Sequence, residues 1–296
     1  MTPRNCLRAM LVVMDLAERL AAALAVTEVV ELVGGHQSRV FRVRSGDGAS
    51  LVVKLLDAAR VDRAALDARL DVTAALADLD DRVCRPRLLG GRRVTELTAS
   101  DGRTHHVVCF EFASGTPPDP ADPADAAAMG VALAQLHGSM RRLPAAALPV
   151  VHALRTVPDD PAAVGAHQLL HGDFGADNLR IAGGVMRIFD FDDCGYGPPA
   201  FDVANALYRV LFDSVTTVTT GATGTYERFR ANFVDGYVGA SGAPLPDEVL
   251  DAFIGLRVRA LGAWLDDLDG APIGIRDASP AWHATLRTFV AGQSRA

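Results

Sequence analysis

The sequence predicts an α+β fold in two lobes, a small one built on an antiparallel sheet and a larger one that is mostly helical. The first part of the 296-residue chain carries short apolar strands around one long helix, and long helical patterns dominate the rest. Between them a Ser-Gly-Thr-Pro-Pro run at 114–118 breaks the chain. We therefore expect an N-terminal lobe at 1–113, with 1–13 as a flexible extension, and a C-terminal lobe at 114–296.

The N-terminal lobe is expected to begin with a helix over 15–26, because Leu16, Leu20 and Leu24 share one helical face. Three strands follow, the second with alternating apolar and charged residues and the third after a Ser-Gly-Asp-Gly turn. An Ala- and Leu-rich helix comes next and ends before Pro86. Two further strands complete the lobe, so that the strands are expected at 29–33, 39–44, 51–56, 88–97 and 104–112 and the second helix at 58–79.

The C-terminal lobe is expected to be helical except in its centre. Apolar residues recur at helical spacing over five segments, at 124–137, 200–212, 225–239, 246–268 and 279–293. The segment 169–194 has instead short apolar runs separated by polar loops, which predicts short strands joined by loops.

The composition excludes several classes of protein. With 29 basic and 36 acidic residues the net charge is −7, which disfavours nucleic acid as a partner, because phosphate neutralisation needs surplus Lys and Arg. No apolar run approaches the roughly 18 residues of a membrane span. The four cysteines have no paired spacing, which favours free thiols. We expect a cytoplasmic monomer or homodimer with no nucleic-acid or membrane partner.

The distribution of basic residues singles out one position. Arginine occurs 28 times but lysine only once, as Lys54 near the end of the third expected strand. Either this is chance in an Arg-rich composition, or the position needs a compact ammonium group that a forked guanidinium cannot replace. Contact with a phosphate is one such need.

The strongest chemical signal lies in the segment His-Gly-Asp-Phe-Gly-Ala-Asp-Asn at 171–178 and in Asp190 beyond it. An Asp two residues after a His, an Asn five residues later and an Asp after a short hairpin form a phosphoryl-transfer arrangement. Asp173 would face the acceptor hydroxyl, and Asn178 and Asp190 would supply oxygen ligands to Mg²⁺. An isolated His-Gly-Asp would instead be read as a loop with a helix cap.

These motifs resemble those of the aminoglycoside phosphotransferase and choline kinase superfamily. The resemblance is carried by H-G-D-F-G-A-D-N at 171–178, I-F-D-F-D-D at 188–193 and G-P-P-A-F-D-V-A at 197–204, with weaker matches at 34–43, 52–54 and 133–137. It implies a bilobal protein-kinase-like fold. It also implies a kinase that uses ATP (or GTP) and Mg²⁺ to phosphorylate an alcohol group of a small-molecule acceptor.

The resemblance also implies roles for single residues. Asp173 would orient the acceptor hydroxyl, Asn178 and Asp190 would hold Mg²⁺, and Lys54 would contact the α- and β-phosphates. Further nucleotide contacts would come from the loop at Gly34 and Gly35 and from the backbone of Phe110, Glu111, Phe112 and Ala113.

Three acidic residues and two bracing residues complete this assignment. The helix after Lys54 contains no Glu, so we expect Asp71 to pair with the lysine, with Asp62 and Asp67 as alternatives. His171 and Asp202 resemble positions that brace the catalytic loop without touching substrate.

The acceptor must be argued from the acceptor site, because one fold serves many substrates. Acidic residues on the C-terminal helices would attract a cationic molecule, although a solvated acidic face is the alternative reading. The candidate acceptor-binding residues are Asp192, Trp264, Asp266 and Asp267. We expect an antibiotic kinase that confers resistance or self-protection and acts on an aminoglycoside or on a cationic peptide antibiotic of the viomycin and capreomycin type.

An alternative acceptor class follows from the segment 189–202. Its F-D-F-D-D-C-G-Y-G-P-P-A-F-D run resembles more closely the branch with homoserine kinase and the bacterial stress-response Ser/Thr protein kinase. A pseudokinase is disfavoured, because Lys54, Asp173, Asn178 and Asp190 are all present.

Overall fold

The computed structural model describes residues 16–32, 38–160, 166–216 and 224–293. The expected extension at 1–13 and the glycine loop at Gly34 and Gly35 lie outside these residues. The chain divides into two compact units, Met1–Ala77 with Cys84–Phe112, and Asp78–Val83 with Ala113–Ala296. This division falls one residue before the expected boundary and assigns 78–83 to the second unit.

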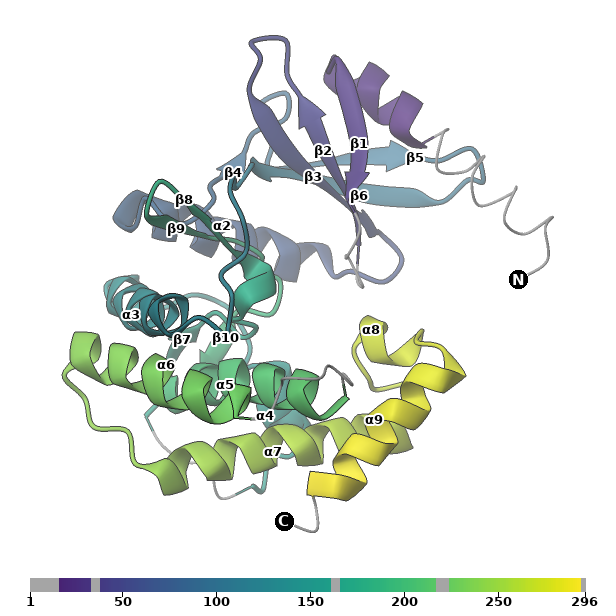
Figure 1. The fold of residues 1–296 in the computed structure, drawn as a ribbon. Helices are drawn as coiled ribbons and strands as arrows, with labels where there is room; N and C mark the ends of the chain where they lie inside the picture. Colours follow the sequence, from purple (N-terminus) through teal and green to yellow (C-terminus); the bar gives the residue numbers. More distant parts are fainter. Residues whose placement is uncertain (1–15, 33–37, 161–165, 217–223, 294–296) are drawn as a thin grey trace. The chain divides into compact units, whose positions relative to one another are not determined.

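The first unit is built on one antiparallel sheet (Figure 1). Its strands lie in the order β1-β2-β3-β6-β4, and β5 also pairs with β6. The expected strand at 88–97 is shorter than predicted, because Gly90 and Gly91 adopt φ values of +57° and +80° in a turn that returns the chain from Leu89 to Arg92. The six strands are β1 Glu28–Leu32, β2 Arg39–Arg44, β3 Ser50–Asp57, β4 Pro86–Arg87, β5 Val94–Thr98 and β6 Thr104–Glu111.

Two helices cover opposite faces of this sheet. Leu16 and Leu20, from a helix at 16–24, pack in one core with Leu55 of β3. Leu66 and Leu70, from α2 (Arg63–Leu79), pack in another core with Leu56. Because consecutive residues of a strand point to opposite faces, Leu55 and Leu56 fix the two helices on the two sides of β3.

The second unit is mostly helical, as expected. Two short helices, α4 and α8, were not expected, whereas the five long helices lie within a few residues of their predicted ranges. The helices are α3 Pro123–Met140, α4 His152–Thr156, α5 Pro199–Thr216, α6 Thr225–Ser241, α7 Asp247–Asp266, α8 Ile273–Arg276 and α9 Pro280–Gln293. Within the described ranges, no helix has the length and apolarity needed to cross a membrane.

Four short strands frame two loops of the second unit. β7 (Gln168–Leu170) pairs with β10 (Gly195–Gly197), and β8 (Leu179–Ala182) forms a hairpin with β9 (Val185–Ile188). The hairpin turns at Gly183 and Gly184, whose φ values of +57° and +79° suit a two-residue turn that only glycine adopts readily. The loops at 171–178 and 189–194 follow β7 and β9.

Helices α3 and α6 pack with their backbones in close approach. A Cβ on Gly130 of α3 would overlap the Phe233 carbonyl oxygen, and a Cβ on Gly236 of α6 would overlap the Ala127 carbonyl oxygen. Each helix therefore presents a glycine where the other passes. The approach also brings the two helices close enough for the side chains of His137 and Tyr237 to meet.

Replacing Gly130 by alanine is expected to force the two helices apart. We expect Gly130→Ala to lower the free energy of unfolding by about 1–3 kcal/mol, the usual range for overpacking a filled core. Gly138→Ala is the matched control in the same helix, since its Cβ would meet nothing closer than an Arg141 side-chain atom at 3.8 Å. The control should be neutral or stabilising by up to about 1 kcal/mol. Urea unfolding followed by circular dichroism measures both, and equal stability of the two variants would contradict the argument.

Candidate active site

A buried carboxylate on α5 holds the start of the 171–178 loop. Asp202, fully buried, accepts hydrogen bonds from the backbone N–H of His171 at 2.8 Å and of Gly172 at 2.9 Å. Gly172 can make this contact because its φ is +84°, and a Cβ there would overlap the Asp193 carbonyl oxygen. The loop is thereby fixed immediately before Asp173.

The same carboxylate reaches α3 and α6 through two side chains. His137 Nε2 lies 3.1 Å from Asp202 Oδ2, and the other ring nitrogen lies 3.0 Å from the Tyr237 hydroxyl. Burial raises the pKa of Tyr237 to about 12, and the charge of Asp202 adds to the effect. The hydroxyl therefore keeps its proton, and Nε2 of His137 is the ring nitrogen that faces the Asp202 carboxylate.

The 189–194 loop is fastened to the 171–178 loop at Phe189. Its backbone N–H donates to the Asn178 carbonyl at 3.1 Å, and its carbonyl accepts from His171 Nε2 at 3.1 Å. The next residue, Asp190, has a φ of +66°, in the left-handed region that non-glycine residues rarely occupy. Backbone of this kind persists where the surroundings enforce it, and it is concentrated at functional sites.

The Asp173 carboxylate is held by its own loop and remains partly open. Its side chain is 32% exposed, and its Oδ2 accepts a hydrogen bond from Asn178 Nδ2 at 3.2 Å. The same Nδ2 donates to the Asp173 carbonyl at 2.8 Å, so the Asn178 amide presents its oxygen elsewhere. An amide oxygen from Asn178 and a carboxylate from Asp190 fit a hard divalent ion whose other ligands are phosphate oxygens and water.

A cation from α5 lies beside Asp173. Arg209 Nη1 is 3.9 Å from Asp173 Oδ1, and its other terminal nitrogen hydrogen-bonds Asp177. Partial burial opposes the charge of Arg209, but Asp173, Asp177 and Asp213 outweigh it and raise the pKa of the guanidinium. Partial desolvation raises the pKa of Asp213, and Asp177 adds to the rise while Arg209 opposes it. The guanidinium of Arg209 is thus stabilised electrostatically by three carboxylates.

In the first unit, the single lysine is buried in the sheet. Lys54 of β3 is 6% exposed, and its ammonium group lies 5.7 Å from the centre of the Phe110 ring. Its neighbours in register are Val40 and Val108. Phe110 and Glu111 end β6, and the Glu111 backbone N–H donates to the Arg85 carbonyl at 3.0 Å. The nucleotide-binding roles expected of Lys54 and of Phe110–Ala113 stay predictions.

The expected pairing of Asp71 with Lys54 is corrected by the structure. The Asp71 side chain is 71% exposed, and its ion pair is with Arg93 Nε at 3.5 Å. Asp67 instead pairs with Arg63 at 2.9 Å, and Asp62 accepts a hydrogen bond from the Ala65 backbone at the start of α2. The side chains of Asp62, Asp67 and Asp71 are therefore used in surface ion pairs or at the start of the helix.

The structure also corrects the expected contact of Trp264 with the acceptor. Trp264 is 6% exposed, its indole N–H donates to Thr156 at 2.9 Å, and its ring packs against His152 and Arg257. The Trp264 side chain is therefore part of the core between the helices.

The three acidic candidates for the acceptor site differ in exposure. Asp266 and Asp267 are exposed at the end of α7, where Asp267 accepts a hydrogen bond from the Asp269 backbone at 3.2 Å. Asp192 is half-buried in the 189–194 loop. Acceptor binding by these three residues stays a prediction.

Comparison with known proteins agrees with this geometry. The model of the phosphotransferase enzyme family matches the chain over residues 28–167 and 153–250. The chain belongs to this family. No curated protein matches the chain. The prediction of a phosphotransferase in this superfamily, an ATP-dependent kinase with a small-molecule acceptor, is confirmed at that level.

Solved structures share the fold at low sequence identity. An amicoumacin kinase in complex with AMP-PNP and Ca²⁺ is 20% identical, with a TM-score of 0.72, and the match covers 94% of this chain and 92% of that one. A microcompartment-associated aminopropanol kinase is 20% identical, with a TM-score of 0.69 and 95% of each chain covered. A macrolide 2'-phosphotransferase from Brachybacterium faecium is 18% identical, with a TM-score of 0.56 and coverage of 92% and 96%. The predicted kinase-like α+β fold is confirmed.

The sequence analysis predicted the bracing role of Asp202 but missed four side chains that this phosphotransferase gathers around Asp202 and the loop, Asn205, Arg209, His137 and Tyr237. Asp202, Asn205 and Arg209 stand at i, i+3 and i+7 of one helix, a spacing that puts them on one face and could have been read from the sequence. His137 and Tyr237 carry no such signal, because they are 100 residues apart and meet only through the packing of α3 on α6.

Substitution at Gly172 should damage the phosphotransferase loop selectively. Gly172→Ala adds a Cβ that overlaps backbone and keeps a strained φ, so we expect a loss of about 1–3 kcal/mol in stability and a fall in kcat of at least roughly tenfold. Gly175→Ala is the control, since its φ is extended and the nearest atom to a Cβ is 4.0 Å away. Thermal unfolding and steady-state turnover measure both, and a Gly172→Ala enzyme with normal turnover would refute the assigned loop geometry.

Proposed function

We propose that this phosphotransferase moves the γ-phosphoryl group of ATP to a hydroxyl of an amine-bearing antibiotic. The supporting observation is the charge around Asp173, where three carboxylates (Asp173, Asp177 and Asp213) are associated with a single guanidinium, that of Arg209. These carboxylates share one positive charge, and an acidic setting of this kind beside the acceptor hydroxyl favours a protonated amine. Two proteins of similar structure are an amicoumacin kinase and an aminopropanol kinase.

The proposed reaction is direct in-line transfer without a phosphoenzyme. The acceptor hydroxyl hydrogen-bonds to the Asp173 carboxylate, its oxygen forms the new P–O bond, and the bond between the γ-phosphorus and the bridging oxygen breaks to release ADP. The hydroxyl proton passes to Asp173 or to the product phosphate. Positioning supplies most of the rate, with Asp173 orienting the nucleophile.

The proposal also includes the residues that would bind the nucleotide and its metal ion. Lys54 would contact the α- and β-phosphates, and Asn178 and Asp190 would hold Mg²⁺. When bound, the ion neutralises charge on the phosphates. The buried position of Lys54 and the left-handed backbone of Asp190 support these roles, since both are costly unless a function retains them.

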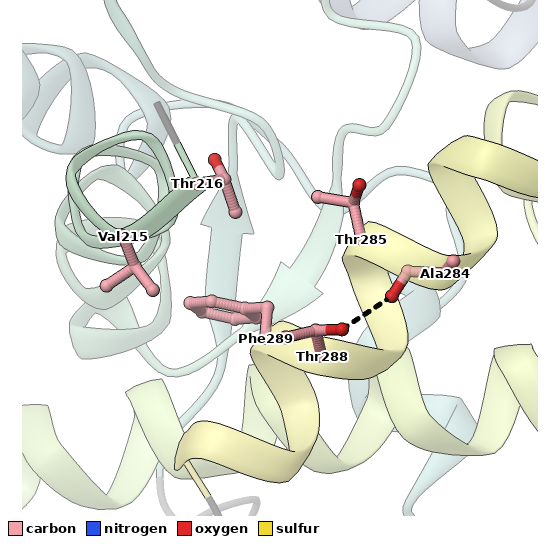
Figure 2. A pocket seen from close by; sticks show the side chains of 6 residues that line it. All are labelled: Val215, Thr216, Ala284, Thr285, Thr288 and Phe289. Carbon is pink, nitrogen blue, oxygen red and sulfur yellow. Dashed lines mark hydrogen bonds between the residues drawn. The ribbon is translucent and has the colours of Figure 1, made fainter. Parts of the chain in front are cut away.

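A pocket in the second unit favours a large acceptor. The pocket, of about 340 Å³, lies between the end of α5 and α9 and is lined by Val215, Thr216, Ala284, Thr285, Thr288 and Phe289 (Figure 2). Thr216 is seven residues beyond Arg209, and two helical turns advance about 10 Å along α5. An antibiotic phosphorylated beside Asp173 could extend this far, whereas an amino alcohol of a few atoms could not.

A second acceptor class is favoured by one observation. Arg209 is 43% exposed beside Asp173, and an exposed guanidinium can bind a substrate carboxylate, as a homoserine-like acceptor would require. We rank this class second, because Arg209 already pairs with Asp177. Protein substrates of the stress-response kinase kind remain a further arm of the test.

The proposal is tested by acceptor-dependent ADP release with the wild-type enzyme and Asp173→Asn. The panel contains aminoglycosides, cationic peptide antibiotics, aminopropanol, homoserine and a generic protein, each with ATP and Mg²⁺. We expect turnover with an amine-bearing antibiotic and a loss of kcat of roughly 10²-fold or more in the variant, with nucleotide affinity by calorimetry unchanged. Turnover of homoserine or protein alone would overturn the acceptor class, and an active variant would overturn the assignment of Asp173.

Filling the pocket should separate large from small acceptors. We expect Thr285→Trp to raise KM for a large antibiotic about tenfold, equivalent to about 1.4 kcal/mol of lost binding. Turnover of any small amino alcohol should be unchanged. Ala281→Trp, one turn earlier on α9 and outside the pocket lining, is the control. Equal kinetics of the two variants toward the antibiotic would remove the pocket from the acceptor site.

A further inference from the structure

Helix α5 contacts the 171–178 loop along one polar face. Asp202 binds the backbone before Asp173, whereas Asn205 and Arg209 reach the Asp173 side chain itself. The two carboxylate oxygens of Asp173 are thus held from different places. Oδ2 is held by Asn178 of the same loop, and Oδ1 faces α5.

Asn205 is in an unfavourable setting for an amide. It is fully buried, its neighbours Val203, Ala204 and Ala206 are buried and apolar, and its Oδ1 has no hydrogen-bond partner among the described residues. A buried acceptor without a partner destabilises the fold, and an apolar side chain of similar size would avoid that cost. Only its Nδ2 finds a partner, Asp173 Oδ1 at 3.5 Å. Rotating the amide would bring two oxygens together, so this orientation is the favourable one.

Arg209 acts on the same oxygen from one turn further along α5. Its Nη1 lies 3.9 Å from Asp173 Oδ1, and its hydrogen bond to Asp177 ties the guanidinium to the loop. Asp177 directly precedes Asn178, so the group that anchors Arg209 is adjacent to the group that holds Oδ2. Each carboxylate oxygen of Asp173 is therefore held by a group whose own position is fixed, Oδ2 by Asn178 and Oδ1 by Asn205 and Arg209.

We propose that Asn205 and Arg209 are positioning residues that fix the rotamer of the Asp173 carboxylate for the acceptor hydroxyl. The inference rests on the proposed role of Asp173. Asn205 holds the position of Asp173 Oδ1 with a hydrogen bond from the buried side, and Arg209 holds it with its charge from the exposed side. Without them the carboxylate is held through Oδ2 alone, and it can turn about its Cβ–Cγ bond away from the hydroxyl.

The test uses Asn205→Leu, which replaces the amide by an apolar side chain of similar size. We expect an unchanged or higher melting temperature, unchanged nucleotide affinity, and a kcat lower by roughly tenfold to a hundredfold, the effect of a misplaced reacting group. A merely structural role predicts the opposite, a lower melting temperature with normal kcat per folded molecule. A stable Asn205→Leu enzyme with normal kcat would overturn the inference.

Arg209 gives a second measurement that does not depend on repacking a core. We expect Arg209→Met to lower kcat with little change in the nucleotide KM, and Arg209→Lys to restore part of the loss. Arg230→Met is the control, because Arg230 pairs with Asp247 and Asp251 on α7 and should affect stability only. Equal kcat in Arg209→Met and wild type would count against the inference. If Asp173→Asn is inactive in that case, the proposed function stands and only the positioning role fails.

Discussion

The geometry of the candidate active site depends on the buried carboxylate of Asp202. A carboxylate buried away from water is tolerated only when hydrogen bonds replace those it would make to water. Asp202 has three such partners, the backbone N–H groups of His171 and Gly172 and the imidazole of His137. Because two of the donors are consecutive residues of the 171–178 loop, the carboxylate fixes both position and direction of the chain entering Asp173. Loss of any donor would leave part of a buried charge unpaired, so the helices and the loop hold one another in place.

The position of the 171–178 loop in turn fixes the 189–194 loop, because both loops form hydrogen bonds at Phe189. His171, whose backbone is held by Asp202, uses its ring to bind the Phe189 carbonyl, and Asn178 binds the Phe189 N–H. Asp190 follows directly and adopts the left-handed backbone. The positions of Asp173, Asn178 and Asp190 are thus linked by short-range contacts within one unit, which is why their spacing along the chain carries so much information.

The sequence could predict what is local and could not predict what packing decides. The 171–178 motif, the expected strands and the long helices depend on neighbouring residues along the chain. Asp71 was misassigned because helical spacing does not reveal that Arg93, in the chain just before β5, forms an ion pair with it. Trp264 was misassigned because an aromatic residue near acidic ones is equally compatible with the core.

Charges close to Asp173 say more about the acceptor than the net charge of the chain does. Exposed charges separated by more than about 8 Å are largely screened at physiological salt. Asp247 and Asp251 of α7 are in addition paired with Arg230, so they offer little attraction to a distant cation. Asp177 and Asp213 both act on Arg209, which lies beside Asp173, so these two carboxylates contribute to the charge next to the proposed reacting hydroxyl. The acceptor class should therefore change with Asp177 and Asp213, and hardly at all with Asp247 and Asp251.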